Sequence, residues 1–325
     1  MHPVPKQISD IGIVPVIAID DAEKAVPLAK ALVAGGLPVA EVTFRTAAGE
    51  AAIRAISREV PEMLVGAGTV LTHDQLDRAL DAGARFIVSP GFNPDMVRYG
   101  LSKGALMVPG TATPGEMEQA MALGLEVVKF FPAEQNGGVA KLKALAGPYK
   151  TLKWMPTGGV NAKNLADYLA FDQIVACGGT WMVKKDLIQQ ENWAEITRLS
   201  REAVRTMLGF SLDHVGINCG SEAEADRLAR TLCDMFGFSY QMGNSSVQAL
   251  HAVECTKTPG RGTHGHIAIA PATWTGRCII WACAASAACR RPARRMPRET
   301  PRPFISTVNS AASPFIWFAD KEESL

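Results

Sequence analysis

The stretch EVVKFFPAEQNGG, from Glu126 to Gly138, has the pattern of a buried strand that runs into a polar, glycine-ended loop. Val127, Val128 and Phe130 form an apolar run, which is typical of a parallel strand covered on both faces. Lys129 interrupts this run. Because burial disfavours the charged form of a lysine, an amine in such a place can act as a nucleophile near neutral pH. The stretch therefore predicts a parallel strand that carries a reactive lysine.

Eight apolar runs, this one included, alternate with longer amphipathic stretches along the first two thirds of the chain. They are VPVIAI (14–19), VAEVTF (39–44), LVGAGTV (64–70), RFIVSPG (85–91), ALMVPGT (105–111), EVVKFFP (126–132), TLKWMPTGG (151–159) and QIVACGGTW (173–181). Strand, loop and helix recur about every 20 to 25 residues, which fits a (β/α)8 barrel. An open, doubly wound sheet is disfavoured because no GxGxxG motif follows the first strand. We therefore predict an α/β fold with a (β/α)8 TIM barrel over residues 1–208.

Polar residues gather where the predicted strands end, which is where a barrel of this kind places its chemistry. Glu41, Thr43 and Arg45 share one face of the second strand, because side chains alternate across a strand. If that face is the barrel interior, a carboxylate and a guanidinium lie in one pocket; the alternative is a structural ion pair. GAGTVL (66–71) and SPG (89–91) end the next two strands, where they either belong to the site or form ordinary tight turns.

Two glycine-rich loops follow the last two predicted strands, TGG at 157–159 and GGT at 178–180. Glycines let backbone N–H groups approach an anion, and these two loops commonly form a phosphate site in this fold. Either loop alone would be weak evidence, because glycine is the usual turn residue. The two together predict phosphate binding.

Lys129 has two interpretations. A strand-borne lysine often extends its ammonium to solvent along an apolar surface. Here the aromatic neighbours, the interior carboxylate and the phosphate loops favour an amine that condenses with a carbonyl group, with Glu41 shuttling protons. The residues alone therefore predict Schiff-base chemistry on a phosphorylated carbonyl compound.

The motifs EVTFRT, GAGTVL, SPG, KFFPAE, NGG, PTGG and GGTW together resemble the class I 2-keto-3-deoxy-6-phosphogluconate (KDPG) aldolases, which often also accept 4-hydroxy-2-oxoglutarate. The resemblance runs from Ile13 to Met207 in one register. It implies retro-aldol cleavage of a small-molecule substrate, either the 2-keto-3-deoxy sugar acid phosphate or the hydroxy-oxoglutarate, on a homotrimeric barrel. It also implies that no cofactor or metal takes part.

The same resemblance implies roles for individual residues. Lys129 matches the Schiff-base lysine and Glu41 the general acid/base. Substrate-binding positions of the family match Arg45 and Thr69 (carboxylate), Pro90 and Phe131 (pocket walls), and Thr157, Gly158, Gly159, Gly178, Gly179 and Thr180 (phosphate side). Serine is common in the family where this chain has Thr180, which keeps the hydroxyl.

Length, composition and net charge limit which class of protein this chain can belong to. The chain has 325 residues, 47% of them hydrophobic, and a formal net charge of +1. Nothing in this balance points to nucleic acid, and no apolar run approaches the ~20 residues of a membrane helix. The seven cysteines form no CxxC pair, so reduced thiols are expected. We predict a cytoplasmic protein without a membrane or nucleic-acid partner.

Residues 209–270 have a second pattern, with the order strand, helix and then three strands. It resembles a glyoxalase-like (vicinal-oxygen-chelate) module, whose members often bind a divalent metal through histidines and glutamates. His214 and His266 lie near the starts of two predicted strands, but no matching acidic residue is evident. We therefore predict no metal ligands, and we expect the α+β module to be incomplete.

Residues 271–325 lose both hydrophobic periodicities and contain many arginines. A basic tail that binds an acidic partner is one interpretation. Another is a frameshift near Ala270, because reading the back-translated segment two nucleotides later restores an amphipathic helix. On that hypothesis residues 210–325 should pack poorly.

Three other functions stay open at this point. A catalytically silent barrel that senses a sugar-acid phosphate would need neither Lys129 nor Glu41. A 2-keto-3-deoxy-6-phosphogalactonate aldolase would differ at one stereocentre of its substrate, which one sequence does not resolve. The C-terminal segment could instead be the active part, as a small metal-dependent lyase or isomerase.

Overall fold

The computed structural model describes residues 3–259 and 264–270. These residues divide between two compact units whose boundary lies between Leu208 and Gly209. Each unit is described by itself. Residues 271–325, with the hypotheses of a basic tail and of a frameshift, lie outside the described residues.

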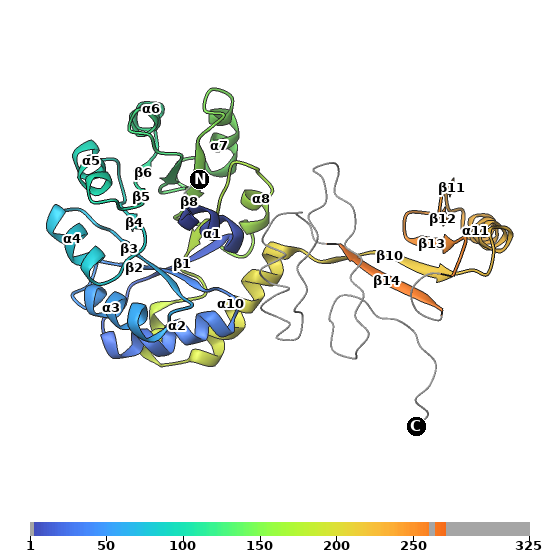
Figure 1. Ribbon diagram of the computed structural model, residues 1–325, viewed down its shortest axis with the longest axis horizontal. Coiled ribbons are helices and arrows are strands. Elements are labelled where there is room, and N and C mark those ends of the chain that lie inside the picture. Colours follow the sequence, from blue (N-terminus) through green and yellow to red (C-terminus); the bar gives the residue numbers. More distant parts are fainter. Residues whose placement is uncertain (1–2, 260–263, 271–325) are drawn as a thin grey trace. The chain divides into compact units, whose positions relative to one another are not determined.

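The first unit is a closed barrel of parallel strands surrounded by helices, as predicted (Figure 1). Its strands are β1 (Ile13–Ile17), β2 (Val39–Thr43), β3 (Leu64–Gly68), β4 (Ile87–Val88), β5 (Met107–Val108), β6 (Gly110–Thr111), β7 (Val127–Phe130), β8 (Lys153–Pro156) and β9 (Cys177–Gly179). Its helices are α1 (Pro3–Ile11), η1 (Ala22–Lys24), α2 (Ala25–Ala34), α3 (Gly49–Glu59), α4 (His73–Asp81), α5 (Pro94–Ser102), α6 (Pro114–Ala122), α7 (Gly138–Ala146), α8 (Leu165–Leu169), α9 (Lys185–Gln189) and α10 (Trp193–Leu208).

Strand pairing shows how the barrel closes. One sheet has the order β5-β4-β3-β2-β1-β9, and a second has the order β6-β7-β8. Met107 and Val108 pair with β4, whereas Gly110 and Thr111 pair with β7, so the fifth predicted strand joins the two sheets in two pieces. Pro109 lies between the pieces and has no N–H to donate to a ladder. Isolated bridges from Trp154 to Ile174 and from Thr157 to Gly178 close the other seam.

Local sequence signals explain the helix ends of the barrel. The side chain of Thr72 accepts a hydrogen bond from the backbone N–H of Gln75 and caps α4, as Ser, Thr, Asn and Asp do at N-caps. Asp21 caps η1 by accepting from the N–H of Glu23. Gly36, just past α2, has a φ of 89°, which glycine adopts at little cost. These local signals mark where η1 and α4 begin and where α2 ends.

The second unit is a five-stranded sheet with one helix. Its elements are β10 (Ser211–Asn218), α11 (Glu222–Phe236), β11 (Tyr240–Met242), β12 (Ser246–Ala249), β13 (Val253–Thr256) and β14 (Gly265–Ala270). The strand order is β11-β12-β13-β10-β14, and β10 pairs with β13 in parallel and with β14 antiparallel. The helix packs on the sheet through a small core of Cys219, Ala225, Ala229, Val247, Ala249 and Cys255.

This core corrects one expectation. The frameshift hypothesis predicts poor packing over residues 210–325, but the described residues of the second unit bury a contiguous apolar cluster between α11 and the sheet. The helix α11 covers one face of the five-stranded sheet, so the described residues of this unit form a small core of their own. Large apolar side chains nevertheless stay exposed in the unit, with Leu212 at 58% and Phe236 at 59%.

Candidate active site

Lys129 and Glu41 meet across the interior of the barrel. Lys129 lies on β7, the sixth strand around the barrel, and Glu41 on β2, the second, so the two strands face each other from opposite walls. The Nζ atom of Lys129 is 3.2 Å from Oε1 of Glu41, and the side chains are only 6% and 1% exposed. Two side chains from opposite walls approach this closely only if both point inward. The structure therefore places the amine inside the barrel and not at its outer surface.

Two features surround the Lys129 amine: an aromatic ring, and a carboxylate with one oxygen that has no hydrogen-bond partner among the described residues. The Nζ atom lies 5.1 Å from the centre of the Phe131 ring, within the range of a cation–π contact. Among the described residues, Oε2 of Glu41 has no hydrogen-bond partner although it is buried. A buried carboxylate oxygen without a partner is costly, and such an atom is suited to accept a proton or a water molecule. A structural ion pair gives no reason for the second oxygen to be left open.

Gly68 is a residue of the site that sequence reasoning missed. A Cβ atom on Gly68 would lie 2.3 Å from Oε1 and 2.7 Å from Cγ of Glu41. Gly68 pairs with Thr43 at the end of β3, so its missing side chain is the space that the Glu41 carboxylate occupies. The motif GAGTVL indicates that another group comes close, since a glycine in a strand interior often marks a close approach. The motif does not indicate which residue that group belongs to.

Arg45 and Thr69 lie just beyond the ends of β2 and β3. Arg45 is exposed, and its Nε donates a hydrogen bond of 3.2 Å to Oγ1 of Thr43. Thr69 has a φ of 56°. A β-branched residue in the left-handed region is strained, and such strain is found chiefly at functional sites. Both residues lie at the carboxyl end of the barrel, Arg45 after the strand that carries Glu41 and Thr69 after the neighbouring strand.

Pro90 and Phe131 follow β4 and β7 at the same end of the barrel, and both are partly buried. A Cβ on Gly110 would lie 2.0 Å from the carbonyl oxygen of Pro90. Glycine at this position therefore lets the chain of β6 pass directly beside the Pro90 loop. The close approach holds the Pro90 loop against β6, and Gly110 of β6 pairs with Lys129.

The two glycine-rich loops lie against each other. Thr157 bridges to Gly178, and a Cβ on Gly178 would lie 2.2 Å from Oγ1 of Thr157. Among the described residues, Oγ1 of Thr157 has no hydrogen-bond partner. Gly158 and Gly159 have φ values of 98° and 81°, which turn the backbone in a way that side chains disfavour. The loops thus meet at the carboxyl ends of β8 and β9.

Thr180, at the end of the second glycine-rich loop, is exposed. Gly179 next to it is buried, and a Cβ there would lie 1.8 Å from the ring of Trp181. The tryptophan of GGTW therefore packs over the glycine and holds the loop, while the Thr180 hydroxyl stays on the solvent side.

Glu134 and Tyr168 form a second contact that the sequence did not reveal. The Tyr168 hydroxyl donates a short hydrogen bond to Oε1 of Glu134, and desolvation, followed by this bond, raises the pKa of Tyr168 well above its usual range. A Cβ on Gly159 would lie 2.5 Å from Cγ of Glu134. Glu134 therefore lies against the first glycine-rich loop and fixes its position from the side of the β7 loop.

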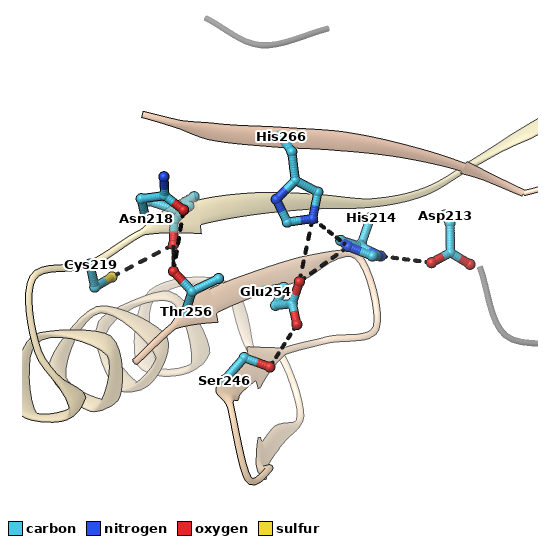
Figure 2. A network of polar contacts seen from close by, with 9 residues as sticks. Asp213, His214, Asn218, Cys219, Ser246, Glu254, Thr256 and His266 are labelled. Carbon is cyan, nitrogen blue, oxygen red and sulfur yellow. Dashed lines mark hydrogen bonds and ion pairs between the residues drawn. The ribbon is translucent and has the colours of Figure 1, made fainter. Parts of the chain in front are cut away.

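His214, Glu254 and His266 form a separate cluster in the second unit (Figure 2). Oε2 of Glu254 is 3.2 Å from Nε2 of His214 and 3.5 Å from Nε2 of His266. The expectation that no acidic residue matches the two histidines is wrong, because β13 pairs with β10 and brings Glu254 beside them. The hydrogen bond with Glu254 raises the pKa of His214, and the same bond lowers the pKa of Glu254.

Comparison with known proteins adds evidence for the barrel. The protein family described as KDPG and KHG aldolase matches residues 4–199. The 2-dehydro-3-deoxy-phosphogluconate aldolase of Haemophilus influenzae is 48% identical over 199 residues, which cover 61% of this chain and 94% of that protein. The KHG/KDPG aldolase of Escherichia coli K12 is 47% identical over 192 residues, covering 59% of this chain and 90% of that protein.

A solved structure shows the same fold. The KDPG aldolase of Legionella pneumophila, crystallised with pyruvate captured at low pH as a covalent carbinolamine intermediate, aligns with a TM-score of 0.60 and 38% identity. The alignment covers 61% of this chain and 97% of that one. Among the described helices, none combines the length and apolar character that crossing a bilayer requires.

Proposed function

Because the chain belongs to the KDPG and KHG aldolase family, we propose that it cleaves 2-keto-3-deoxy-6-phosphogluconate to pyruvate and glyceraldehyde 3-phosphate through a Schiff base on Lys129. The protein is a carbon–carbon lyase, a class I aldolase. A second substrate of the same site is 4-hydroxy-2-oxoglutarate, which gives pyruvate and glyoxylate. The observation that carries the proposed mechanism is the buried contact of 3.2 Å between Nζ of Lys129 and Oε1 of Glu41.

The covalent step begins with the neutral amine of Lys129. Its nitrogen attacks the C2 keto carbon to give a carbinolamine, and loss of water gives a protonated imine. The contact with Glu41 provides a carboxylate that can take the proton which the amine must lose before it attacks. The covalent carbinolamine of the Legionella relative with pyruvate supports the same first step in this chain.

Cleavage follows from the electronics of the imine. Glu41 removes the proton of the C4 hydroxyl, directly or through one water, and the C3–C4 bond breaks as its electrons move into the iminium. The aldehyde product leaves, and an enamine stays on Lys129. Protonation of the enamine at C3, from Glu41, and hydrolysis of the imine then release pyruvate and restore the amine. Oε2 of Glu41, which no described residue contacts by a hydrogen bond, supports this role in proton transfer.

Substrate binding is assigned to the carboxyl end of the barrel. Arg45 pairs with the substrate carboxylate, since a guanidinium binds this group in a bidentate way, and Thr69 lies on the neighbouring strand end. Pro90 and Phe131 form the walls. Thr157, Gly158, Gly159, Gly178, Gly179 and Thr180 hold the phosphate. The opposed loops support the phosphate assignment, as does Oγ1 of Thr157, which has no hydrogen-bond partner in the part of the chain that the structure describes.

Borohydride trapping tests the covalent mechanism. We expect that reduction of the protein with pyruvate present adds one pyruvyl group, because borohydride converts a reversible imine into a stable amine. Mass spectrometry of a tryptic digest should place the group on Lys129. The control is reduction without pyruvate. Protein of unchanged mass after reduction with pyruvate, or a group on another lysine, would overturn the assignment.

Gly68→Ala tests whether Glu41 must be held in place. A methyl group at this position would lie 2.3 Å from Oε1 of Glu41, so the carboxylate must move. Misplacement of a catalytic group by about 1 Å can cost on the order of 100-fold in rate, and we expect a loss of kcat of that order. Gly115→Ala is the matched control, because a Cβ on Gly115 meets nothing within 4 Å. A variant as active as the parent would show that Glu41 need not occupy this place.

The alternative of a silent sensor barrel is not favoured, because a binding protein needs neither the buried amine nor the carboxylate beside it. Cleavage of the galactonate-derived substrate is a less favoured alternative for this chain, since a native KDPGal structure is only 22% identical to it. Cleavage rates on the three substrates, measured side by side with lactate dehydrogenase to detect pyruvate, would rank them. We expect the phosphogluconate-derived substrate to have the highest kcat/KM.

The resemblance also supports a homotrimer and a cytoplasmic location as proposals. No disulfide bond joins the cysteines of the described residues, which agrees with a reducing compartment. Sedimentation equilibrium would test the assembly, and a mass of one or two chains would contradict the trimer.

A further inference from the structure

Two asparagine side chains hold one carbonyl group of the first glycine-rich loop. Nδ2 of Asn161 donates a hydrogen bond of 2.9 Å to the carbonyl oxygen of Gly159, and Nδ2 of Asn164 donates one of 3.2 Å. Both amide oxygens already accept from backbone N–H groups, Oδ1 of Asn164 from Asn161 and Oδ1 of Asn161 from Lys163. The amide nitrogens are therefore the groups that face the Gly159 carbonyl. We call Asn161 and Asn164 the amide clamp.

The other two carbonyl groups of this loop are held from the loop that follows β7. The backbone N–H of Ala133 donates a hydrogen bond of 2.8 Å to the carbonyl oxygen of Thr157, and the N–H of Glu134 donates one of 3.1 Å to that of Gly158. Together with the amide clamp, these contacts give each carbonyl group of the TGG sequence a protein donor. The carbonyl oxygens of the loop are therefore directed toward the protein.

The held carbonyl groups set the direction of two N–H groups. In a trans peptide the C=O and the following N–H point to opposite sides. The N–H of Gly159 is therefore turned away from Glu134, and the N–H of Val160 is turned away from the amide clamp. No described residue accepts a hydrogen bond from either N–H group. Two successive N–H groups without a protein acceptor are suited to bind one anion.

The loop itself does not fix the direction of these N–H groups. Gly158 and Gly159 have no side chains, and glycine has more accessible backbone conformations than any other residue. Rotation of the peptide between Gly159 and Val160 would replace its N–H by its carbonyl oxygen, whose partial negative charge repels an anion. The amide clamp opposes this rotation, because the rotated carbonyl would lose both of its donors.

Helix α8 connects the supports on both sides of the loop. Asn164 directly precedes α8, and the N–H of Tyr168 on this helix donates a hydrogen bond of 3.3 Å to the carbonyl oxygen of Asn164. Tyr168 is fully buried, and its hydroxyl holds the carboxylate of Glu134, whose own N–H holds the Gly158 carbonyl. The orientation of the loop thus depends on a packed helix and not on the glycines alone.

We propose that Asn161 and Asn164 are positioning residues that make the barrel prefer phosphorylated substrates, because they hold the N–H groups of Gly159 and Val160 toward the phosphate. The inference rests on the proposed function, which assigns the phosphate to this loop. It places part of the substrate specificity in two side chains that act through the backbone and touch no substrate. Their effect should be confined to substrates that carry a phosphate, which 4-hydroxy-2-oxoglutarate lacks.

Kinetics on two substrates test the amide clamp. In the double variant Asn161→Ala/Asn164→Ala we expect kcat/KM for 2-keto-3-deoxy-6-phosphogluconate to fall by about 10- to 100-fold, the value of a hydrogen bond to a charged group, mainly through a higher KM. The kcat/KM for 4-hydroxy-2-oxoglutarate should stay at the parent value. Asn192→Ala is the matched control, because Oδ1 of this exposed residue also accepts from a backbone N–H, that of Glu195. Equal losses on both substrates, or no loss, would overturn the proposal.

Binding of 3-phosphoglycerate separates this inference from the proposed chemistry, because this probe carries a phosphate and needs no turnover. Titration calorimetry of the full chain should show Kd raised about 10- to 100-fold in the double variant and unchanged in Asn192→Ala, with circular dichroism establishing that each variant is folded. Borohydride trapping of pyruvate on Lys129 should proceed equally in parent and double variant. Failure of trapping in the parent would contradict the Schiff base and leave the clamp standing. Equal phosphoglycerate binding by parent and double variant, or none by the parent, would overturn the clamp and leave the Schiff base standing.

Discussion

Lys129→Ala is expected to lower kcat for cleavage of 2-keto-3-deoxy-6-phosphogluconate by at least about 1,000-fold, because the variant has no amine to form the imine that accepts the electrons of the breaking bond. No other described lysine contacts Glu41 in the barrel interior, so a neighbouring amine is not placed to substitute. Coupled detection of pyruvate measures the loss. The variant should also take up no pyruvyl group on reduction with borohydride.

Two further variants separate chemistry from stability. Lys129→Arg keeps a positive charge beside Glu41 but supplies no nucleophile near neutral pH, so it should be as inactive as the alanine variant while disturbing the buried carboxylate less. Lys143→Ala on α7, an exposed position, is the matched control and should retain the parent rate. Circular dichroism and Tm establish that each variant is folded. If Lys129→Arg turned over substrate at a rate near the parent's, the ion pair and not the imine would be the essential feature.

Most of the barrel was predictable because each strand carries its own signal. All eight predicted apolar runs contain strands of the barrel, since strands covered on both faces are apolar along their whole length. The fifth run differs only in being split at Pro109. Proline in that run indicates an interruption of the strand, because it can donate no ladder hydrogen bond. The neighbour with which each half pairs depends on closure of the whole barrel.

Contacts between distant segments were harder to predict. The space for Glu41 depends on Gly68, and the first glycine-rich loop lies against Glu134, which Tyr168 holds. A glycine inside a strand, as at Gly68, indicates a close approach but not its partner, and nothing in the local sequence distinguishes Glu134 or Tyr168 from ordinary loop and helix positions. Their partners follow only from strand register and from the angle at which helices pack on the barrel. The sequence therefore predicted the residues that carry the chemistry of the site, but not the residues that hold them in position.

Glu254 was missed for a related reason. Its strand, VECT, is only four residues long, and a shift of one residue in register turns every side chain of a strand to the other face of the sheet. With so short a pattern, the sequence did not indicate whether Glu254 faced the histidines. Parallel pairing of β13 with β10, which sets Gly216 opposite Glu254, settles its register and brings the carboxylate beside His214.

Glu41→Gln is expected to lower kcat by about 100- to 10,000-fold, the range typical of a lost general acid/base. Glutamine keeps the size and shape of the side chain in a place that is only 1% exposed, so the barrel should stay folded. It does not take up a proton, however, and the C4 hydroxyl then has no base to start the cleavage. Pyruvate release from the phosphorylated substrate, measured under single-turnover conditions, gives the rate of this step.

The two barrel variants should differ in what borohydride traps. Lys129 is intact in Glu41→Gln, so reduction with pyruvate should still add a pyruvyl group, although more slowly because the amine has lost the carboxylate that accepts its proton. An adduct without turnover would assign Lys129 to bond formation and Glu41 to proton transfer. Glu59→Gln, an exposed carboxylate at the end of α3, is the matched control. Turnover by Glu41→Gln at the parent rate would assign the proton transfer to another group, since a side chain that can neither gain nor lose a proton cannot perform it.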